Sequence, residues 1–366
     1  MSLRVLLKSP LTPFTGYGND GIGLVLAMQD LGIDVTLDPM TVQPPLPPQV
    51  AALLTRPIEP PYDLLIHHVD PIQAQLEPAY QKIAHRRVLW TMWEYWGWGD
   101  CDPRPCHTDY DLIVAYDQTT AWNFSNDGVP LERLKVIQGG YDPAQWLVED
   151  PRRDWDDPIR FCMAGALAGR KAPFVAIKAH KLLKESYDDY HGELHLKTLS
   201  QNLHPGMEKW ALGVKIHFAL WNQPQMKAFY QSCHAYISTS TGEGKDLPAV
   251  EAATTGAVPI LSPCGGHLQW HMPSTGYLLP GIKVPLHTII PQVPQDDDRI
   301  AIQVTVEDTA AAMYHVYTHR QEASEKGIAA AEILPKQLDW RRQIPLVLNA
   351  ALATEPRSQQ MPMQRA

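Results

Sequence analysis

Cysteine is scarce in this 366-residue chain, and long apolar runs are missing. The five cysteines are odd in number and lie mostly in apolar segments, unlike the paired cysteines of a secreted disulfide framework. Residues 1–9 form one short apolar segment with two basic residues, without the long apolar stretch and cleavage site of a signal peptide. No run approaches the roughly 20 apolar residues that a membrane-spanning helix needs. We therefore expect a cytoplasmic protein without a membrane span.

Basic charge is also in short supply. Lysine and arginine number 31 against 40 acidic residues, which gives a formal net charge of -9. This balance provides no basic field for a phosphate backbone, so charge does not indicate nucleic acid as a partner. The chain is 45% hydrophobic and 19% charged, which is typical of a globular protein. Its length favours two α/β domains.

The first half of the chain alternates short apolar strands with helical segments. A glycine-rich stretch at residues 15–23 connects the first strand to a helix at 24–31, which Gly32 closes. Short, almost wholly apolar strands are typical of a parallel sheet that is covered on both faces. The strands are predicted at residues 3–7, 34–37, 63–67, 87–91 and 111–115.

A charged segment bracketed by prolines, residues 149–158, predicts a linker. The alternation restarts after it and predicts a second parallel sheet. Residues 280–303, rich in proline, are predicted to form a long surface loop. Strands are predicted at residues 160–164, 193–199, 214–219 and 235–239, and helices at 173–184, 225–230, 306–321 and 340–352.

The most informative segment is residues 238–270, where Glu243 precedes Glu251 by eight positions. Pro248 predicts a helix start, which puts Glu243 in the preceding loop and Glu251 about one turn inside the helix. N–H groups at that start favour an anion such as a diphosphate. The first carboxylate could accept hydrogen bonds from sugar hydroxyls and the second from a ribose diol. Each acid alone is also what the helix dipole favours at a helix start.

This segment resembles the signature of glycosyltransferase family 4, which reads Glu-Gly-x-x-Leu-Pro-x-x-Glu-Ala, then Gly-x-x-Pro-hydrophobic, then Gly-Gly. The matching residues are Glu243, Gly244, Leu247, Pro248, Glu251, Ala252, Gly256, Pro259, Gly265 and Gly266. The resemblance implies that Glu243 contacts the donor sugar and Glu251 the nucleotide ribose. Asp246 departs from the family's usual glycine, and an extra carboxylate beside the phosphates could alter donor preference or weaken binding.

A basic pair, Arg170 and Lys171, follows the first strand of the second half. Lys171 falls where the family has its phosphate-binding lysine. The family's usual arginine is Ala166 here, so we expect Arg170 to supply the second charge. Basic residues before a helix oppose its dipole, and residues that break a local rule concentrate at functional sites. The other interpretation is a solvated loop.

Two features of the first half fit the same resemblance. Gly16 and Gly18 would let the backbone approach the donor phosphates or the acceptor closely. Without the signature at residues 238–270, a simple tight turn would be the better interpretation of these glycines. Residues 88–94 resemble the strand-end element of a family subgroup, which makes Glu94 a candidate sugar-contacting or acceptor-side residue. A surface acid at a strand end is the other interpretation of Glu94.

Further candidates for the acceptor side are His67, His68 and Trp93. The two histidines end a predicted strand, and we expect one of them to be buried and the other to contact a ligand. Trp93 belongs to a tryptophan cluster that either lines an acceptor surface or packs in the core. The triplets at residues 100–102 and 154–156 could each hold a cation, but they lie in an irregular loop and in the linker. Residues 101–107 contain two cysteines and a histidine without a common zinc spacing. We expect no metal.

The resemblance implies a GT-B fold: two Rossmann-like domains with a donor-binding cleft between them. We expect an acceptor domain at residues 1–148, the linker at 149–158 and a nucleotide-sugar domain at 159–335. A C-terminal helix at 336–353 would be able to cross back to the first domain, and the tail at 354–366 would be disordered.

The implied function is transfer of a hexose from a UDP- or GDP-sugar to an acceptor, with retention of configuration and without a metal. Arg170, Lys171 and backbone N–H groups near Gly16 and Pro248 would neutralise the leaving diphosphate. Two other functions stay open. One is a GT-B protein that binds a nucleotide or partner without turnover, and the other is a GT-B epimerase or phosphorylase. The acceptor could be a glycan, a metabolite, a lipid head group or a modified nucleobase.

Overall fold

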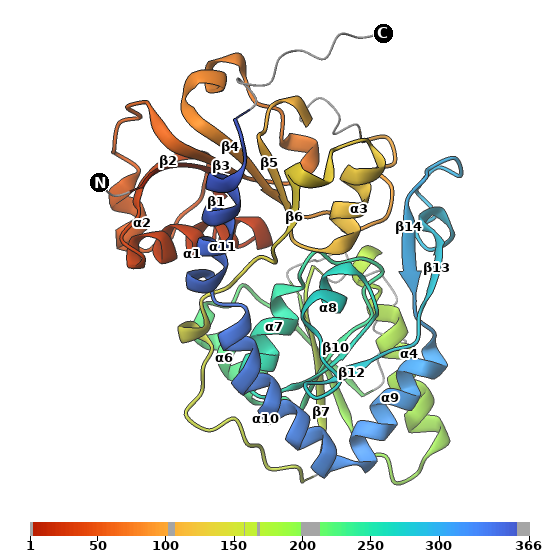
Figure 1. The fold of residues 1–366 in the computed structure, drawn as a ribbon. Helices are drawn as coiled ribbons and strands as arrows, with labels where there is room; N and C mark the ends of the chain where they lie inside the picture. The colour runs from red at the N-terminus through yellow and green to blue at the C-terminus, as the bar shows by residue number, and fades with distance from the viewer. Residues whose placement is uncertain (1–2, 102–106, 157, 167–168, 199–212, 357–366) are drawn as a thin grey trace. The chain divides into compact units, whose positions relative to one another are not determined.

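The computed structural model describes residues 3–101, 107–156, 158–166, 169–198 and 213–356. The chain divides into two compact units (Figure 1). Unit 1 comprises residues 1–142 and 338–366, and unit 2 comprises residues 143–337. The predicted domain boundary at 148/149 therefore differs from the division between the units, because residues 143–148 group with unit 2. The predicted tail lies mostly outside the described residues.

Unit 1 is built on a six-stranded parallel sheet in the order β2-β1-β3-β4-β5-β6. Its strands are β1 (Arg4–Leu11), β2 (Asp34–Val42), β3 (Tyr62–His68), β4 (Ala84–Thr91), β5 (Leu112–Ala115) and β6 (Leu134–Val136). Its α-helices are α1 (Gly16–Asp30), α2 (Pro48–Leu53), α3 (Gln118–Asn126) and α11 (Trp340–Ala353). Helices α1 and α11 pack against each other on one face of the sheet (Figure 1). Apolar residues of β1, β3, β4 and these helices form one continuous core.

Helix α1 begins eight residues before the predicted start at Leu24, so the glycine-rich stretch is helical. The hydroxyl of Thr15 caps the helix by accepting a hydrogen bond from the Gly18 N–H at 3.1 Å. A Cβ atom at Gly18 would lie 2.3 Å from the Thr12 carbonyl oxygen, and one at Gly23 would lie 2.5 Å from Trp340 Nε1. These glycines therefore allow close packing of the helix.

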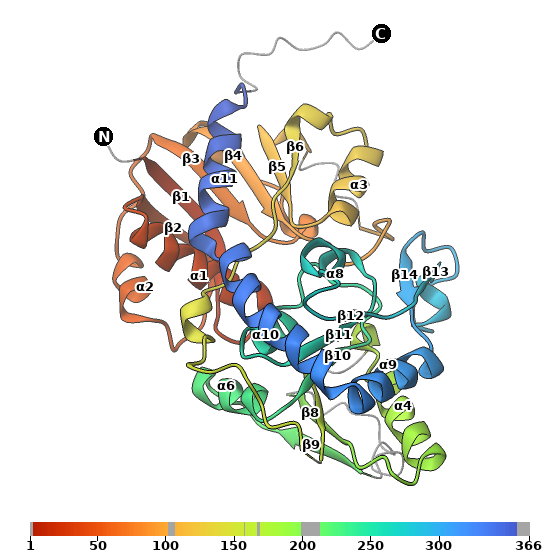
Figure 2. The same ribbon diagram turned by 60° about the horizontal axis from the view of Figure 1, so that its bottom comes forward.

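Unit 2 is built on a second six-stranded parallel sheet, in the order β12-β11-β10-β7-β8-β9. Its strands are β7 (Arg160–Gly165), β8 (Glu193–Thr198), β9 (Val214–Phe218), β10 (Ala235–Ser238), β11 (Val258–Leu261) and β12 (Tyr277–Leu278). Its α-helices are α4 (Pro173–Ser186), α6 (Gln223–Gln231), α7 (Leu247–Thr254), α8 (Gly265–Trp270), α9 (Val306–Thr318) and α10 (Arg320–Gln337). Helices α4 and α9 lie side by side (Figure 2).

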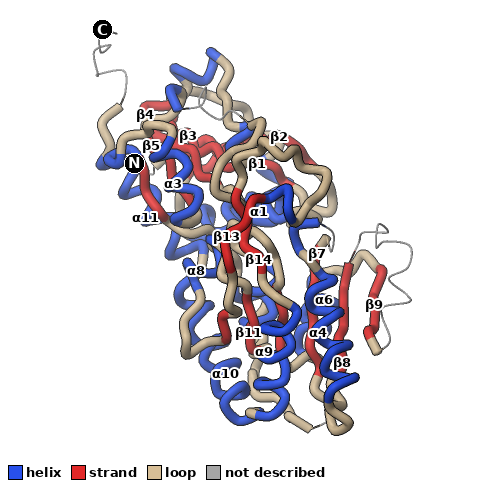
Figure 3. The backbone as a smooth tube through the Cα atoms, turned by 90° about the vertical axis from the view of Figure 1, so that its right-hand side faces the viewer, coloured by secondary structure: helices blue, strands red, loops and turns tan. Residues whose placement is uncertain are grey.

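Three segments of unit 2 differ from their prediction. The predicted loop at 280–303 contains an antiparallel pair of strands, β13 (Ile282–Pro285) and β14 (Ile300–Gln303) (Figure 3). In this pair Ile282 is opposite Gln303. The helix predicted at 306–321 ends at Thr318, and α10 follows it. The sequence of Gly265 and Gly266 predicts a turn at the carboxyl end of a strand, but these residues begin α8. No helix within the described ranges has both the length and the apolar character needed to cross a membrane.

Short 3₁₀ segments lie between these elements. In unit 1 they are η1 (Pro71–Gln73), η2 (Pro78–Lys82) and η4 (Leu131–Arg133), and in unit 2 they are η5 (Pro143–Gln145), η6 (Gly169–Lys171) and η7 (Leu286–Thr288). Segment η6 positions the predicted basic pair between β7 and α4.

Candidate functional site

The candidate site lies at the edge of the unit 2 sheet where β7, β10 and β11 end. These parallel strands are neighbours, so the loops that leave their carboxyl ends meet. The Thr241 N–H donates to the Arg170 carbonyl oxygen at 2.8 Å, and the Thr239 hydroxyl donates to the Ala172 carbonyl oxygen at 2.9 Å. These bonds connect the loop after β10 to η6, so Glu243 is brought close to the basic pair.

Glu243 is the centre of a buried charge cluster. Its Oε1 atom lies 2.7 Å from Arg170 Nη1 and 2.6 Å from Lys171 Nζ. Lys171 Nζ also lies 2.9 Å from Asp246 Oδ1. The side chains of Glu243 and Lys171 are 5% and 11% exposed, whereas that of Arg170 is 30% exposed. Arg170 is thus the most accessible of these four charged side chains.

The members of this cluster hold one another in their charged forms. Burial lowers the pKa of Lys171, but the charges of Asp246 and Glu243 outweigh it and the pKa is raised. Burial raises the pKa of Glu243, but Arg170 and Lys171 outweigh that effect and the pKa is lowered. A buried ammonium group and a buried carboxylate therefore face each other.

Asp246, the departure from the family signature, occupies a position that suits glycine. Its φ is 62° and its ψ is 66°, which is left-handed backbone, and it directly precedes α7. Its buried side chain accepts hydrogen bonds from Ser238 Oγ at 2.6 Å and His267 Nε2 at 3.0 Å. Burial raises the pKa of Asp246, but Lys171 and His267 lower it by more than burial raises it, so the pKa is lowered overall. The extra carboxylate is therefore charged.

His267 completes the cluster and was missed in the sequence analysis. It lies on α8 and is fully buried. Its Nε2 atom faces the Asp246 carboxylate, and its Nδ1 atom lies 2.7 Å from the Ser262 carbonyl oxygen. Both partners are acceptors, so both ring nitrogens must carry a proton. Burial lowers the pKa of His267, but Cys264 and Asp246 raise it well above the usual value. The sequence signal that could have identified His267 is its position directly after Gly265 and Gly266 of the signature.

Gly266 fixes the loop that carries Glu243. A Cβ atom at Gly266 would lie 2.4 Å from the Gly244 carbonyl carbon, so only glycine allows this approach. The Gly266 N–H donates to the Glu243 carbonyl oxygen at 2.7 Å. Helix α8 thus contacts the Glu243 loop through backbone, which holds its carboxylate beside the basic pair.

The start of α7 offers less to an anion than the sequence analysis predicted. Helix α7 begins at Leu247, and Pro248, its second residue, has no N–H. The N–H groups of Ala249 and Val250 donate to the Asp246 carbonyl oxygen at 2.9 and 3.2 Å. Cationic side chains therefore supply most of the positive charge in this region.

Glu251 lies on α7 and is 8% exposed. The Tyr230 hydroxyl donates to its Oε2 atom at 3.3 Å. Lys197 on β8 is near enough for the Glu251 charge to act on it, although burial is the larger influence and lowers the pKa of Lys197. Glu251 thus lies about one turn inside α7, the helix that Asp246 directly precedes.

The candidates of unit 1 lie at the start of α1, which follows β1, and at the carboxyl ends of β3 and β4. Glu94 is half-buried in the segment after β4. Trp93 is buried, and its indole N–H donates to the Gly97 carbonyl oxygen at 2.8 Å. Gly16 is the first residue of α1, and a Cβ atom there would meet nothing within 4 Å. The geometry favours core packing for Trp93.

Both histidines at the end of β3 are fully buried. His67 Nδ1 lies 2.5 Å from Tyr110 Oη, and burial lowers the pKa of His67 to about 3. His68 Nδ1 lies 2.9 Å from Ser9 Oγ, and its Nε2 atom lies 2.7 Å from Tyr116 Oη. Both imidazole rings therefore have hydrogen-bond partners within unit 1.

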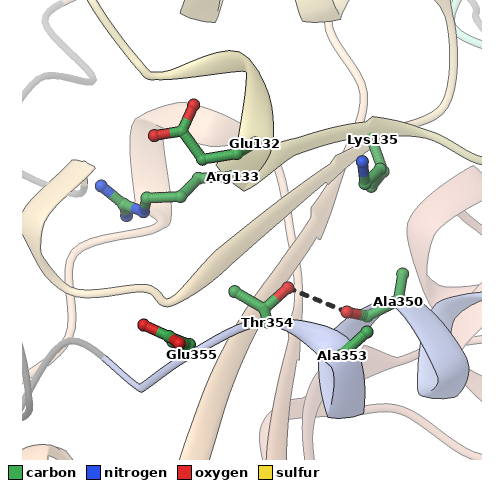
Figure 4. Close-up of a pocket in the computed structure, with 7 residues that line it drawn as sticks. All are labelled: Glu132, Arg133, Lys135, Ala350, Ala353, Thr354 and Glu355. Atoms are coloured by element: carbon green, nitrogen blue, oxygen red, sulfur yellow. Dashed lines mark hydrogen bonds between the residues drawn. The ribbon is translucent and has the colours of Figure 1, made fainter.

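A separate cavity of about 340 Å³ lies in unit 1 between the β6 region and the end of α11 (Figure 4). None of the predicted site residues lines it. Its lining residues are Glu132, Arg133, Lys135, Ala350, Ala353, Thr354 and Glu355.

The two segments considered for a metal near residue 101 include residues that the structure does not describe. Asp102 of the triplet 100–102 and Cys106 of the segment 101–107 lie outside the described residues. In the part of the chain that is described, no group of three or more His, Cys, Asp or Glu side chains is arranged to hold a metal ion.

Comparison with known proteins gives the fold and a family match for part of the chain. Residues 149–279 match the family model described as "Glycosyl transferases group 1", and this region contains the whole charge cluster. No curated protein matches the sequence.

Several solved structures are similar over nearly the whole chain. HepE of Anabaena, in complex with UDP and glucose, is 17% identical, with a TM-score of 0.62 over 95% of this chain and 100% of that one. Sucrose-phosphate synthase of Thermosynechococcus elongatus is 15% identical, with a TM-score of 0.66 over 96% and 100%. The catalytic domain of starch synthase IV from Arabidopsis thaliana, bound to ADP and acarbose, is 11% identical, with a TM-score of 0.63 over 96% and 99%. The predicted GT-B fold, with two parallel six-stranded sheets, is confirmed.

Proposed function

We propose that this protein is a glycosyltransferase that moves a hexose from a UDP- or GDP-sugar to an acceptor, with retention of configuration and without a metal. The observation that carries the proposal is the cluster of Arg170, Lys171 and Glu243 at the carboxyl edge of the unit 2 sheet. The family match over residues 149–279 supports the reaction type. HepE, a structural neighbour, binds UDP and glucose, which supports a nucleotide-sugar donor.

In this proposal the basic pair binds the donor diphosphate. Two cations fixed by hydrogen bonds and ion pairs can stabilise the charge of a departing nucleoside diphosphate without reorganising, the role that a metal ion has in other transferases. Arg170 is the more exposed of the two, so it would make the first contact with the phosphates. Glu243 would then bind sugar hydroxyls, and Glu251 would bind the ribose.

Glu94 is the proposed acceptor-side residue, since it is half-buried at the carboxyl end of the unit 1 sheet. Gly16 and Gly18 stay proposed as positions where donor or acceptor approaches the backbone. The thiols of Cys162, Cys233 and Cys264 are free, which supports a reducing compartment such as the cytoplasm.

The direct test is Glu243→Gln, which keeps the shape of the side chain and removes its charge. We expect sugar transfer or donor hydrolysis to fall at least about 100-fold, because a misplaced donor loses its reactive geometry. The assay uses a panel of UDP- and GDP-sugars, and NMR of the product anomeric carbon reports whether configuration is retained.

The matched control is Asp297→Asn. Asp297 is also a buried carboxylate of unit 2, and its Oδ2 atom lies 2.7 Å from Arg299 Nη2. We expect this variant to keep its activity, because the pair is in the β13–β14 region. Full activity of Glu243→Gln would overturn the assignment of Glu243, and inversion in the product would overturn retention.

A second candidate function is nucleotide binding without turnover. The observation that favours it is Lys171 Nζ at 2.9 Å from Asp246, since a carboxylate there competes with a phosphate. Thermal stabilisation by UDP or GDP, with no turnover of any sugar donor in the panel, would support this alternative. Turnover of one donor excludes it.

A further inference from the structure

Asp246, the residue that departs from the family signature, contacts His267 in the cluster. Asp246 uses one carboxylate oxygen to hold Lys171 at 2.9 Å and the other to accept from His267 at 3.0 Å. Both side chains are fully buried. A carboxylate beside a phosphate-binding lysine should repel a diphosphate unless another cation neutralises it.

His267 is that cation, because each of its two ring nitrogens faces a hydrogen-bond acceptor. The Ser262 carbonyl oxygen at 2.7 Å requires a proton on Nδ1, and the Asp246 carboxylate at 3.0 Å favours a proton on Nε2. Cys264 Sγ lies farther from Nδ1, at 3.2 Å. The Nδ1–H group therefore donates its hydrogen bond to the carbonyl oxygen. Cys264 is fully buried, and no neutral imidazole nitrogen is left to activate its thiol as a nucleophile.

We infer that Asp246 and His267 form a buried ion pair that positions Lys171, and that the site accepts the diphosphate of a sugar donor only while His267 carries its proton. The inference rests on the proposed function and adds two positioning residues to it. With His267 protonated, the cluster contains three cations and two anions and has a net charge of about +1. With His267 neutral, it contains two of each and has no net charge.

The groups around His267 come from the starts of α7 and α8 and from the rest of the charge cluster. Asp246 contacts it from the start of α7, and Cys264 contacts it from the start of α8. The indole ring of Trp270 lies edge-on at 6.0 Å and carries no charge. Glu243 of the cluster and His271 at the end of α8 interact with His267 through space, and Lys171 contacts the same Asp246 carboxylate. Asp246 is the one carboxylate among these groups that accepts a hydrogen bond from the imidazole ring.

The test compares UDP and GDP binding to wild type, His267→Gln, Asp246→Asn and the double variant by calorimetry from pH 6 to 9.5. Asparagine keeps the shape of Asp246 and tolerates left-handed backbone. At neutral pH we expect His267→Gln to bind about tenfold more weakly, because the Asp246 charge is no longer neutralised. The double variant should recover to within about threefold of wild type, since no uncompensated carboxylate is left. Variants are compared at each pH, so the titration of the nucleotide cancels.

The pH profile separates positioning from simple packing. Wild-type affinity should fall as pH rises through the pKa of His267, and Asp246→Asn should lose most of that fall. The control is His180→Gln, which changes another fully buried histidine of unit 2 that is bonded to Tyr190. We expect this control to leave both affinity and pH profile unchanged. Equal affinity of wild type and His267→Gln at every pH would overturn the inference while leaving the proposed function intact.

Imidazole ¹⁵N spectra test the ion pair independently of any nucleotide. The signals that His267→Gln removes belong to His267, and we expect them to report a charged ring at pH 7.5 whose pKa falls in Asp246→Asn. A neutral ring at that pH would overturn the inference. If wild type binds neither UDP nor GDP while the ring is charged, the proposed function fails and the ion pair stands as a structural feature.

Discussion

Buried histidines of this chain differ in protonation because their ring nitrogens face different partners. Tyr110 donates its hydroxyl proton to the Ala74 carbonyl oxygen, so its oxygen accepts from His67 Nδ1. The other nitrogen, Nε2, faces the weakly polar Met40 Sδ at 3.3 Å. This environment suits a neutral ring, whereas the two acceptors around His267 suit a charged one.

The first prediction concerns His67→Gln. The pKa of His67 is about 3 in the folded protein and about 6.5 in an unfolded chain. Below pH 6.5 the unfolded state binds a proton that the folded state does not, so the free energy of unfolding falls as pH falls. Wild type should lose about 2 kcal/mol more than His67→Gln between pH 8 and pH 5. Urea unfolding at several pH values measures this difference, and a constant difference would contradict it.

The second prediction concerns His267, whose contribution to the free energy of unfolding should depend on pH with the opposite sign. Its folded pKa lies above the unfolded value, so its contribution to stability is fully present below pH 6.5 and is lost as pH rises through the folded pKa. The stability difference between wild type and His267→Gln should therefore shrink at alkaline pH. The same unfolding series measures it, and a difference that grows with pH would show that the ring is neutral in the folded state.

At the scale of elements, the loops around the cluster carry unusual backbone. Among the described residues, the non-glycine residues with positive φ are Ala172 and Asp246, at the starts of α4 and α7. Asp246 gains hydrogen bonds in this conformation, but the methyl side chain of Ala172 gains none. Strain of this kind concentrates at functional sites, which agrees with the position of the cluster.

Ala172→Gly should therefore stabilise the protein by about 1 kcal/mol, because glycine adopts φ 42° without steric cost. The control applies the same change where the backbone is helical: Ala329→Gly in α10 should destabilise by about 1 kcal/mol. Denaturant unfolding of both variants measures the two effects. Two shifts of the same sign would show that the strain at Ala172 is absent.

The sequence predicted most strands, because short apolar runs are typical of a covered parallel sheet. It did not predict β13 and β14, which are short and partly exposed and pair across a long connection. Helix α10 was missed because Gly327 and Pro335, both inside it, are helix-breaking signals. The glycine-rich stretch before Leu24 was assigned to a turn, but packing of α1 against Thr12 and Trp340 makes it helical.

The site could be predicted in part. The signature and the basic pair identified Glu243, Arg170 and Lys171, which the structure brings together. Asp246 was noted only as a departure, because its left-handed backbone and its bond to His267 depend on how α7 and α8 pack. Residues distant in sequence thus become partners through tertiary contacts that no local pattern records.

At the scale of the whole molecule, the chain leaves unit 1 and returns to it. Helix α11, near the C-terminal end of the chain, packs on α1 and β4, and Trp340 at its start is 1% exposed. The indole lies edge-on to Trp90 at 5.3 Å, and Gly23 and Gly140 leave space for it. The core of unit 1 therefore depends on residues some 200 positions after its last strand, β6.

Trp340→Ala should destabilise unit 1 by about 3–5 kcal/mol, since it empties a large buried site that two glycines shape. The control is Leu346→Ala on the same helix, where the side chain is 47% exposed and the expected change is within about 0.5 kcal/mol. Hydrogen exchange measures the effect strand by strand. Because the ring packs among residues of unit 1, protection should fall in β1, β3 and β4 and persist in β7, β10 and β11. Equal loss in both sheets would show that the two units unfold together, and that α11 stabilises the whole chain.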